Sequence, residues 1–205
     1  MSAAALQVGG LVPMTTVDYP DRLSAVVFCQ GCPLRCRYCH NGSLLPRHGG
    51  ERIPWQRILD FLDSRRGLLD AVVFSGGEPT QQRALPAAIE SVRAMGFDIG
   101  LHTAGVYPER LRQLLPLLDW VGLDVKALPA DYEALTGMAG SGELAWRSAK
   151  LLVDSGLPHE VRTTWHPALM SPDQRKQLSG TVKALGEVRH VWQACRSGHC
   201  LDPAL

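Results

Sequence analysis

The chain has 205 residues, of which 45% are hydrophobic and 20% are charged, a balance typical of a single globular domain. Its 21 basic and 20 acidic residues leave a formal net charge of +1, which argues against a surface for nucleic acid or for an anionic membrane as the main function. No apolar run approaches the roughly 20 residues that cross a bilayer, and the N-terminus lacks the regions of a secretory signal. We therefore expect one domain over residues 1–205, in the cytoplasm.

Short strands and amphipathic helices alternate along the chain. The predicted strands are rich in Val, Ile and Phe, and they cover residues 23–28, 70–76, 97–103, 119–127, 159–165 and 187–193. The predicted helices cover residues 54–67, 81–96, 108–118, 142–156 and 171–186, with Pro86 expected to cause a local irregularity. This alternation predicts βαβ units with a parallel sheet, either doubly wound or an incomplete (βα) barrel.

The chemically unusual residues follow the predicted strands. In both candidate folds, functional residues gather at the carboxyl ends of the strands. A cysteine-rich loop follows the first strand, and the later strands are followed by "SGGEPT", "HTAG", "DVK", "RTTWHP" and "QACRSGHC". The sequence therefore predicts one functional site at this edge of the sheet.

Four cysteines stand close together in "FCQGCPLRCRYCHN", residues 28–41. Cys29, Cys32, Cys36 and Cys39 could form a closed tetrahedral zinc site, although structural zinc sites more often take ligand pairs from two separated pieces of chain. Alternatively, Cys32, Cys36 and Cys39 could hold an iron–sulfur cubane, which leaves one iron open to a small molecule. In that interpretation Cys29, at the end of the first strand, is a packed thiol.

The spacing Cys32-x3-Cys36-x-Tyr38-Cys39 resembles the signature of the radical S-adenosylmethionine (SAM) superfamily. The resemblance implies an α/β fold with an incomplete (βα)6 parallel barrel. It also implies a [4Fe–4S] cluster held by those three cysteines, whose open iron binds SAM. One electron from the cluster then cleaves SAM to methionine and a 5′-deoxyadenosyl radical, which abstracts a hydrogen atom.

Two further motifs are similar to elements of that superfamily. "SGGEP" resembles the GGEP element and would place Gly76, Gly77, Glu78 and Pro79 beside the methionine part of SAM, although the same letters also occur in ordinary turns. "DVK" resembles a D-x-K element and would set Asp124 and Lys126 against the polar end of SAM, with Lys126 as partner of the carboxylate. The alternative is a lysine at a solvent-exposed strand end.

The resemblance narrows to activases of glycyl radical enzymes. "DYPDRLSAVVFCQGCPLRCRYCHN" looks like the N-terminal part of these activases in general. "YEALTG", the SG of "LLVDSGLPHEVRTT" and "VWQACRSGHCLDP" look like segments of the anaerobic ribonucleoside-triphosphate reductase-activating group. This implies hydrogen abstraction from a glycine of a partner enzyme, with a flavodoxin or ferredoxin as electron donor. A formate-lyase-type partner is the alternative, as is a small substrate of the 7-deazaguanine type. Outside the superfamily, a non-enzymatic zinc or electron-transfer module would leave "SGGEP" and "DVK" unexplained.

Several positions depart from the pattern or stay open. Many activases carry an acidic D-T-N-G element where this chain has "HTAG", so a monovalent cation near His102 is in doubt, and a packed or hydrogen-bonded His102 is expected. The resemblance assigns Tyr38, Cys39 and His40 to the SAM site, His40 through its backbone. Two further sets of residues have more than one interpretation: Cys195 and Cys200 are a redox pair, metal ligands or isolated thiols, and His166 is a ribose contact or a loop residue.

Overall fold

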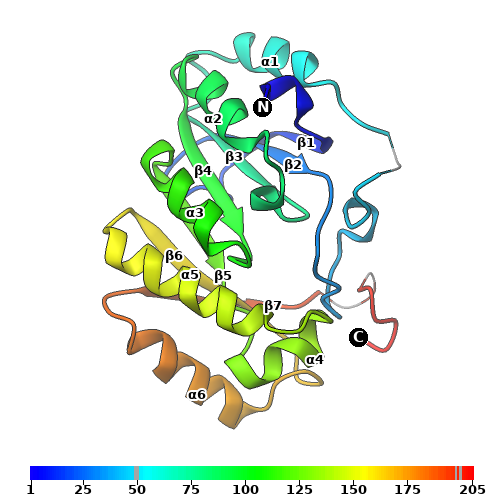
Figure 1. The fold of residues 1–205 in the computed structure, drawn as a ribbon, viewed down its shortest axis with the longest axis vertical. Helices are drawn as coiled ribbons and strands as arrows, with labels where there is room; N and C mark the ends of the chain where they lie inside the picture. The colour runs from blue at the N-terminus through cyan, green and yellow to red at the C-terminus, as the bar shows by residue number, and fades with distance from the viewer. Residues whose placement is uncertain (49–50, 197, 199) are drawn as a thin grey trace.

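The computed structural model describes residues 1–48, 51–196, 198 and 200–205. It contains one curved sheet with helices packed along it (Figure 1). The strands are β1 (Val8–Thr15), β2 (Ser24–Cys29), β3 (Ala71–Gly76), β4 (Asp98–Thr103), β5 (Trp120–Asp124), β6 (His159–Trp165) and β7 (Arg189–Ala194). The helices are α1 (Trp55–Asp63), α2 (Leu85–Arg93), α3 (Pro108–Leu114), α4 (Tyr132–Thr136), α5 (Ser141–Ser155) and α6 (Pro172–Lys183).

The strands lie in the order of the chain, from β1 to β7. Strands β2 to β7 are parallel, so the six predicted strands and their parallel pairing are confirmed. A doubly wound sheet would reverse its strand order, whereas this order continues in one direction as in a barrel. Within the described residues β7 does not pair with β1, so the barrel is incomplete.

Strand β1 was not predicted. It pairs antiparallel with β2 at the edge of the sheet. Its sequence, "VGGLVPMT", contains two glycines and Pro13, which are poor strand formers, and proline lacks a donor for the ladder. An edge strand tolerates them because one of its sides has no neighbour to which it must donate.

The two faces of the sheet bury different sets of side chains. Because successive residues of a strand point to opposite faces, Val27 and Val72 join the core between the sheet and the helices, whereas Val26 and Val73 point into the barrel. Tyr19 and Trp120 lie with that inner set, with their ring centroids 5.3 Å apart. The inner apolar residues fill the end of the barrel where the strands begin.

The helices follow their sequence signals closely. Helix α6 has the capping box expected of its "SPDQ" start, since Ser171 and Gln174 cap each other's backbone N–H. The expected irregularity at Pro86 is wrong, because α2 begins at Leu85 and Pro86 therefore lies in the first turn, where no intrahelical donor is lost. No helix in the described residues is long and apolar enough to cross a membrane.

The C-terminal segment returns to the cysteine loop. The Leu201 amide donates to the Cys39 carbonyl at 3.0 Å, and the Asp202 amide donates to the Arg37 carbonyl at 2.9 Å. Figure 1 shows this segment, in red, beside the blue loop that follows β2. The two ends of the parallel sheet are thus tied together across the edge where the predicted site lies.

Candidate functional site

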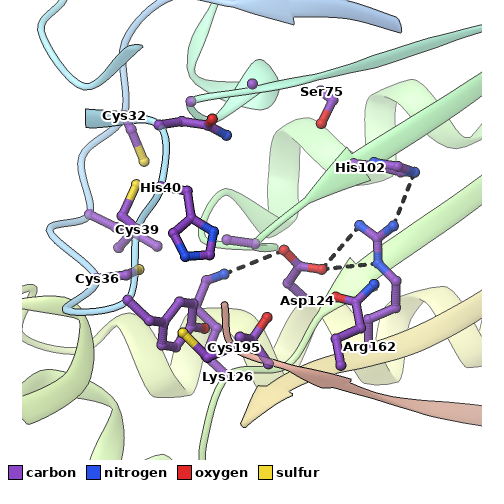
Figure 2. Close-up of a pocket in the computed structure, with 18 of the residues that line it drawn as sticks. Cys32, Cys36, Cys39, His40, Ser75, His102, Asp124, Lys126, Arg162 and Cys195 are labelled. Atoms are coloured by element: carbon purple, nitrogen blue, oxygen red, sulfur yellow. Dashed lines mark hydrogen bonds and ion pairs between the residues drawn. The ribbon is translucent and has the colours of Figure 1, made fainter. Parts of the chain in front are cut away.

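A cavity of about 500 Å³ opens at the carboxyl ends of the parallel strands. Figure 2 shows that its wall combines the cysteine loop with residues from β4, β5, β6 and the segment after β7. Nine of the predicted site residues line it, namely Cys32, Cys36, Tyr38, Cys39, His40, Gly76, Gly77, Asp124 and Lys126. The prediction of one site at this edge of the sheet is therefore consistent with the tertiary structure.

The cysteine loop is held in place mainly by backbone hydrogen bonds. The Arg35 amide donates to the Thr136 carbonyl at 2.7 Å, and the Arg37 amide donates to the Leu135 carbonyl at 3.1 Å, so α4 anchors the middle of the loop. The Cys32 amide donates to the Leu45 carbonyl at 3.1 Å. Because these bonds do not involve the thiols, the sulfur atoms stay available as ligands.

The structure separates Cys29 from the other three cysteines of the loop. Cys29 is fully buried in the core between the sheet and the helices, on the same face of β2 as Ala25 and Val27. Cys32, Cys36 and Cys39 instead line the cavity. Burial raises the pKa of the Cys32 thiol to about 12, with the Glu78 carboxylate adding to the effect. Without a bound metal ion this thiol is therefore neutral.

Gly76 and Gly77 allow the β3 loop to pass directly beside the cysteine loop. A Cβ on Gly76 would collide with the Cys29 backbone, and Gly76 also has a φ of +112°. A Cβ on Gly77 would collide with the Gly31 carbonyl. The two loops are joined by hydrogen bonds from the Gly77 amide to the Cys29 carbonyl and from the Glu78 amide to the Gly31 carbonyl, both 2.9 Å long.

Glu78 supports the site from behind the cavity. Its side chain is fully buried, and its carboxylate accepts hydrogen bonds from Thr80, Thr103 and the Ala104 amide. These bonds connect the β3 loop to the end of β4. Glu78 and Pro79 are absent from the described residues that line the cavity, so a contact between the Glu78 side chain and a ligand has no support in this geometry.

Asp124, Lys126 and Arg162 form a charged group on the cavity wall (Figure 2). Lys126 Nζ lies 3.4 Å from Asp124 Oδ2, and Arg162 Nη2 lies 3.1 Å from Asp124 Oδ1. Burial alone would raise the pKa of Asp124, but the Arg162 guanidinium and the Lys126 ammonium outweigh burial and hold it below its ordinary value. This group therefore carries one carboxylate and two cations, an excess of positive charge that suits an anionic group of a ligand.

Arg162 is the site residue that the sequence prediction did not single out. In "HEVRTTW" it shares a strand face with Glu160 and Thr164, while the opposite face carries Val161 and Thr163. A run of polar residues on the barrel side of a buried parallel strand is unusual, because both faces of such a strand are normally apolar. That alternation was the available signal for a polar barrel interior.

His102 is packed and hydrogen-bonded, as expected. Its Nε2 lies 2.8 Å from the Asp18 carbonyl and 3.1 Å from Arg162 Nη1. One ring nitrogen cannot both donate to the carbonyl and accept from the guanidinium, so we assign the shorter contact as the hydrogen bond. Burial, together with the Arg162 charge, lowers the pKa of His102 to about 3. With the guanidinium beside it, this position is poorly suited to a monovalent cation.

His40, Cys195 and Cys200 gather at the rim of the cavity, so the two C-terminal thiols are not isolated. His40 and Cys195 line the cavity. His166 does not line the cavity but lines an adjoining recess of about 20 Å³, and its Nδ1 accepts a hydrogen bond from the Ala168 amide. A ribose contact by His166 therefore gains no support.

Residues 26–185 match the family model of the Radical SAM superfamily. The chain belongs to the radical SAM superfamily. The match includes the cysteine loop and every parallel strand up to β6, so the fold and the motifs of this radical SAM protein agree with each other.

Curated relatives place this radical SAM protein among the activating enzymes. It is 33% identical over 185 residues to a Methanocaldococcus jannaschii protein provisionally named as a glycyl-radical enzyme activating enzyme, covering 86% of this chain and 75% of the relative. It is 32% identical over 185 residues to the pyruvate formate-lyase-activating enzyme of Clostridium pasteurianum, covering 87% of this chain and 76% of the relative. The predicted enzyme class, a radical SAM glycyl-radical-enzyme activating enzyme, is confirmed.

Solved structures agree on the fold. The structure of Streptococcus suis SuiB bound to S-adenosylmethionine aligns with a TM-score of 0.65 and 17% sequence identity, covering 83% of this chain and 40% of that one. At this identity the likeness concerns the fold alone, and the chain spans two fifths of the length of SuiB.

The cofactors of this radical SAM protein are a [4Fe–4S] cluster and SAM, as predicted. The cavity suits both groups. Three unpaired thiols on one loop provide soft ligands for iron. The Tyr38 hydroxyl is buried without a hydrogen-bond partner among the described residues, so a bound ligand could satisfy it.

Proposed function

We propose that this protein activates a glycyl radical enzyme by generating a glycyl radical on it. One observation carries the proposal: the Cys32, Cys36 and Cys39 thiols share a single open cavity with the Asp124, Lys126 and Arg162 group. Three thiols that hold an iron–sulfur cluster would by themselves be compatible with simple electron transfer, and a charged pocket by itself would be compatible with many ligands. Their combination suits a cluster that works directly on a bound charged cofactor.

In this proposal Cys32, Cys36 and Cys39 are the protein ligands of the cluster. Cys29 is not a ligand, because its thiol packs on the opposite face of β2. When bound, the cluster and SAM supply a one-electron cleavage that yields a 5′-deoxyadenosyl radical able to abstract hydrogen. The chain contributes the ligands, the orientation of SAM and a wall that restricts water.

The polar wall would orient SAM through the charges of its amino acid part. Lys126 and Arg162 suit the carboxylate, and Asp124 suits the ammonium or a ribose hydroxyl. The backbone at Gly76, Gly77 and His40 would lie beside SAM. The Lys126 ammonium lies over the Tyr38 ring, with Nζ 5.6 Å from the ring centroid. Glu78 acts on this arrangement by fixing the β3 loop.

The partner is a glycyl radical enzyme, and we propose an anaerobic ribonucleoside-triphosphate reductase, on the resemblance of "YEALTG" and "VWQACRSGHCLDP" to that activase group. The Clostridium relative favours a pyruvate formate-lyase-type partner as the second candidate. A flavodoxin or ferredoxin would supply the electron. Several residues that line the cavity are exposed to solvent, among them His40, Asn41, Gln193 and Arg196, which leaves access for a loop of a protein substrate.

The test begins with anaerobic reconstitution of the cluster, reduction with dithionite and addition of SAM. We expect 5′-deoxyadenosine and methionine in the product mixture. Each candidate partner is then added, and the glycyl radical is sought as a doublet by electron paramagnetic resonance. A fully loaded sample that leaves SAM intact would refute the radical reaction. Cleavage without a glycyl doublet on either partner would instead refute the assignment as an activase of these enzymes.

A further inference from the structure

Three chemically related side chains from distant parts of the chain meet at the rim of the cavity. His40 lies at the end of the cysteine loop, Cys195 follows β7, and Cys200 lies in the C-terminal segment. One ligand atom from each lies within 4.8 Å of the other two. His40 is exposed and both thiols are partly exposed, so the cluster is accessible to an ion from solvent.

We propose that His40, Cys195 and Cys200 form a second metal site for a borderline-soft divalent ion such as Zn²⁺, separate from the iron–sulfur cluster. Two thiolates and one imidazole are a ligand set that such an ion prefers, and the fourth position is left to water. On binding, each thiol loses its proton to solvent and no electron is transferred.

The distances between the ligand atoms fit this site. With Zn–S bonds of about 2.3 Å and Zn–N bonds of about 2.0 Å, tetrahedral corners lie about 3.8 Å apart for two sulfurs and about 3.5 Å apart for sulfur and nitrogen. Cys195 Sγ and Cys200 Sγ are 3.7 Å apart, and Cys200 Sγ and His40 Nε2 are 3.5 Å apart. The third edge is at most 4.8 Å, within the reach of a side-chain rotation.

The bonding of the metal-free group leaves room for an ion to improve it. His40 Nε2 lies 2.6 Å from the Arg196 carbonyl and 3.5 Å from the Cys200 thiol. The carbonyl contact requires a hydrogen on Nε2, and the Cys195 and Cys200 thiols lie 3.7 and 3.5 Å from the same carbonyl oxygen, so three donors compete for its two lone pairs. A metal ion would bind the lone pair of His40 Nε2 in place of the hydrogen bond to the Arg196 carbonyl.

The backbone already holds the two pieces of chain in register for this site. The Leu201 and Asp202 amides donate to the carbonyls of Cys39 and Arg37, and the Arg37 guanidinium pairs with the Asp202 carboxylate at 2.7 Å. A metal ion bound by His40, Cys195 and Cys200 would link these contacts to the end of β7, where Cys195 lies. It would therefore fix the C-terminal segment as a wall of the cavity, directly after the cluster ligand Cys39.

The experiment uses the anaerobic protein with its iron–sulfur cluster intact, loaded with Zn²⁺ and freed of excess ion. Zinc and iron are counted separately by mass spectrometry, and the zinc ligands are identified by X-ray absorption at the zinc edge, where iron does not interfere. We expect one zinc per chain with two sulfur neighbours at about 2.3 Å. Cys195→Ser and Cys200→Ser should each lose the zinc and keep about four irons, while the matched Cys29→Ser should keep both metals.

Three results would overturn the proposal. The first is wild-type protein that retains no zinc. The second is zinc retained equally by both serine variants, or zinc with four sulfur neighbours, which would mean that it had displaced iron from the cluster cysteines. The third is a Cys195–Cys200 disulfide in the anaerobic holoprotein, found as a loss of two thiols, because a disulfide removes both thiolates.

Discussion

Arg162 lies directly opposite Asp124 in the register of β5 and β6, and its Nε and Nη2 atoms are each 3.1 Å from Asp124 Oδ1. This pair joins two adjacent strands on the cavity wall, and Lys126 approaches the other oxygen of the same carboxylate. The charged wall is therefore a product of strand register, and it can be changed one residue at a time.

Arg162→Met should lower the free energy of unfolding by roughly 1–3 kcal/mol, because Asp124 would lose a partner in a partly buried place. The loss stays below that of a fully buried pair because 34% of the Asp124 side chain is exposed. Urea unfolding measures this loss. The exposed Arg66→Met serves as a control, and its free energy of unfolding should stay within about 0.5 kcal/mol of the wild-type value. If Asp124→Asn combined with Arg162→Met costs the plain sum of the two single changes, the two side chains are not coupled.

Of the four cysteines of the loop, only one should be replaceable by alanine without loss of the iron–sulfur cluster. Cys32→Ala, Cys36→Ala and Cys39→Ala should each abolish the [4Fe–4S] absorption after anaerobic reconstitution, because a cubane cannot stay bound by two thiolates. Cys29→Ala should retain the iron and lose only packing, since its thiol lies in the core. Equal loss of iron from Cys29→Ala would restore a site of four equivalent thiols.

Glu78→Gln should destabilise the protein by about 1–3 kcal/mol. The carboxylate accepts hydrogen bonds from Thr80, Thr103 and the Ala104 amide. The glutamine side chain has an NH2 group in place of one carboxylate oxygen, so some of these buried donors would face another donor and lose their acceptor. Thermal or urea unfolding gives the loss, and the exposed Glu90→Gln on α2 serves as the control. Unchanged stability would mean that these bonds have little net value.

Gly77→Ala and Gly180→Ala should have opposite effects. A methyl group on Gly77 meets the Gly31 carbonyl of the cysteine loop, so we expect a loss of roughly 1–3 kcal/mol and reduced iron loading. On Gly180, an exposed position within α6, a methyl group meets no other atom within 4 Å and should gain up to about 1 kcal/mol through helix propensity. Full iron loading by Gly77→Ala would show that the loops can separate without harm to the site.

His102 should make the protein less stable as the pH falls. Its pKa is lowered from 6.5 to about 3 in the folded protein, so between these values the unfolded chain binds a proton that the folded chain does not. The free energy of unfolding should therefore fall with decreasing pH through that window, by up to about 1.4 kcal/mol per pH unit from this group. The free energy of unfolding, measured by urea unfolding at several pH values, should depend less steeply on pH in His102→Gln than in wild type or in the exposed His48→Gln. An identical pH dependence in all three proteins would contradict this.

The sequence by itself determined the six parallel strands and the family, and the resemblance of its motifs predicted that Cys29 differs from the other three cysteines of the loop. These properties follow from local patterns: apolar segments of strand length, glycine and proline at element ends, and thiols at fixed spacing on one loop. Even the isolation of Cys29 is local in origin, because alternation along β2 assigns it to the face of Ala25 and Val27.

Only the tertiary structure decided which distant residues meet. The register of β5 and β6 brings Arg162 to Asp124, and the return of the C-terminal segment brings Cys200 to His40 across 160 positions of sequence. The tertiary structure also shows that the Glu78 side chain faces the interior of the protein rather than the cavity. Such contacts depend on strand order and on how loops close, and side chains far apart in the chain leave no periodic signal from which either could be read.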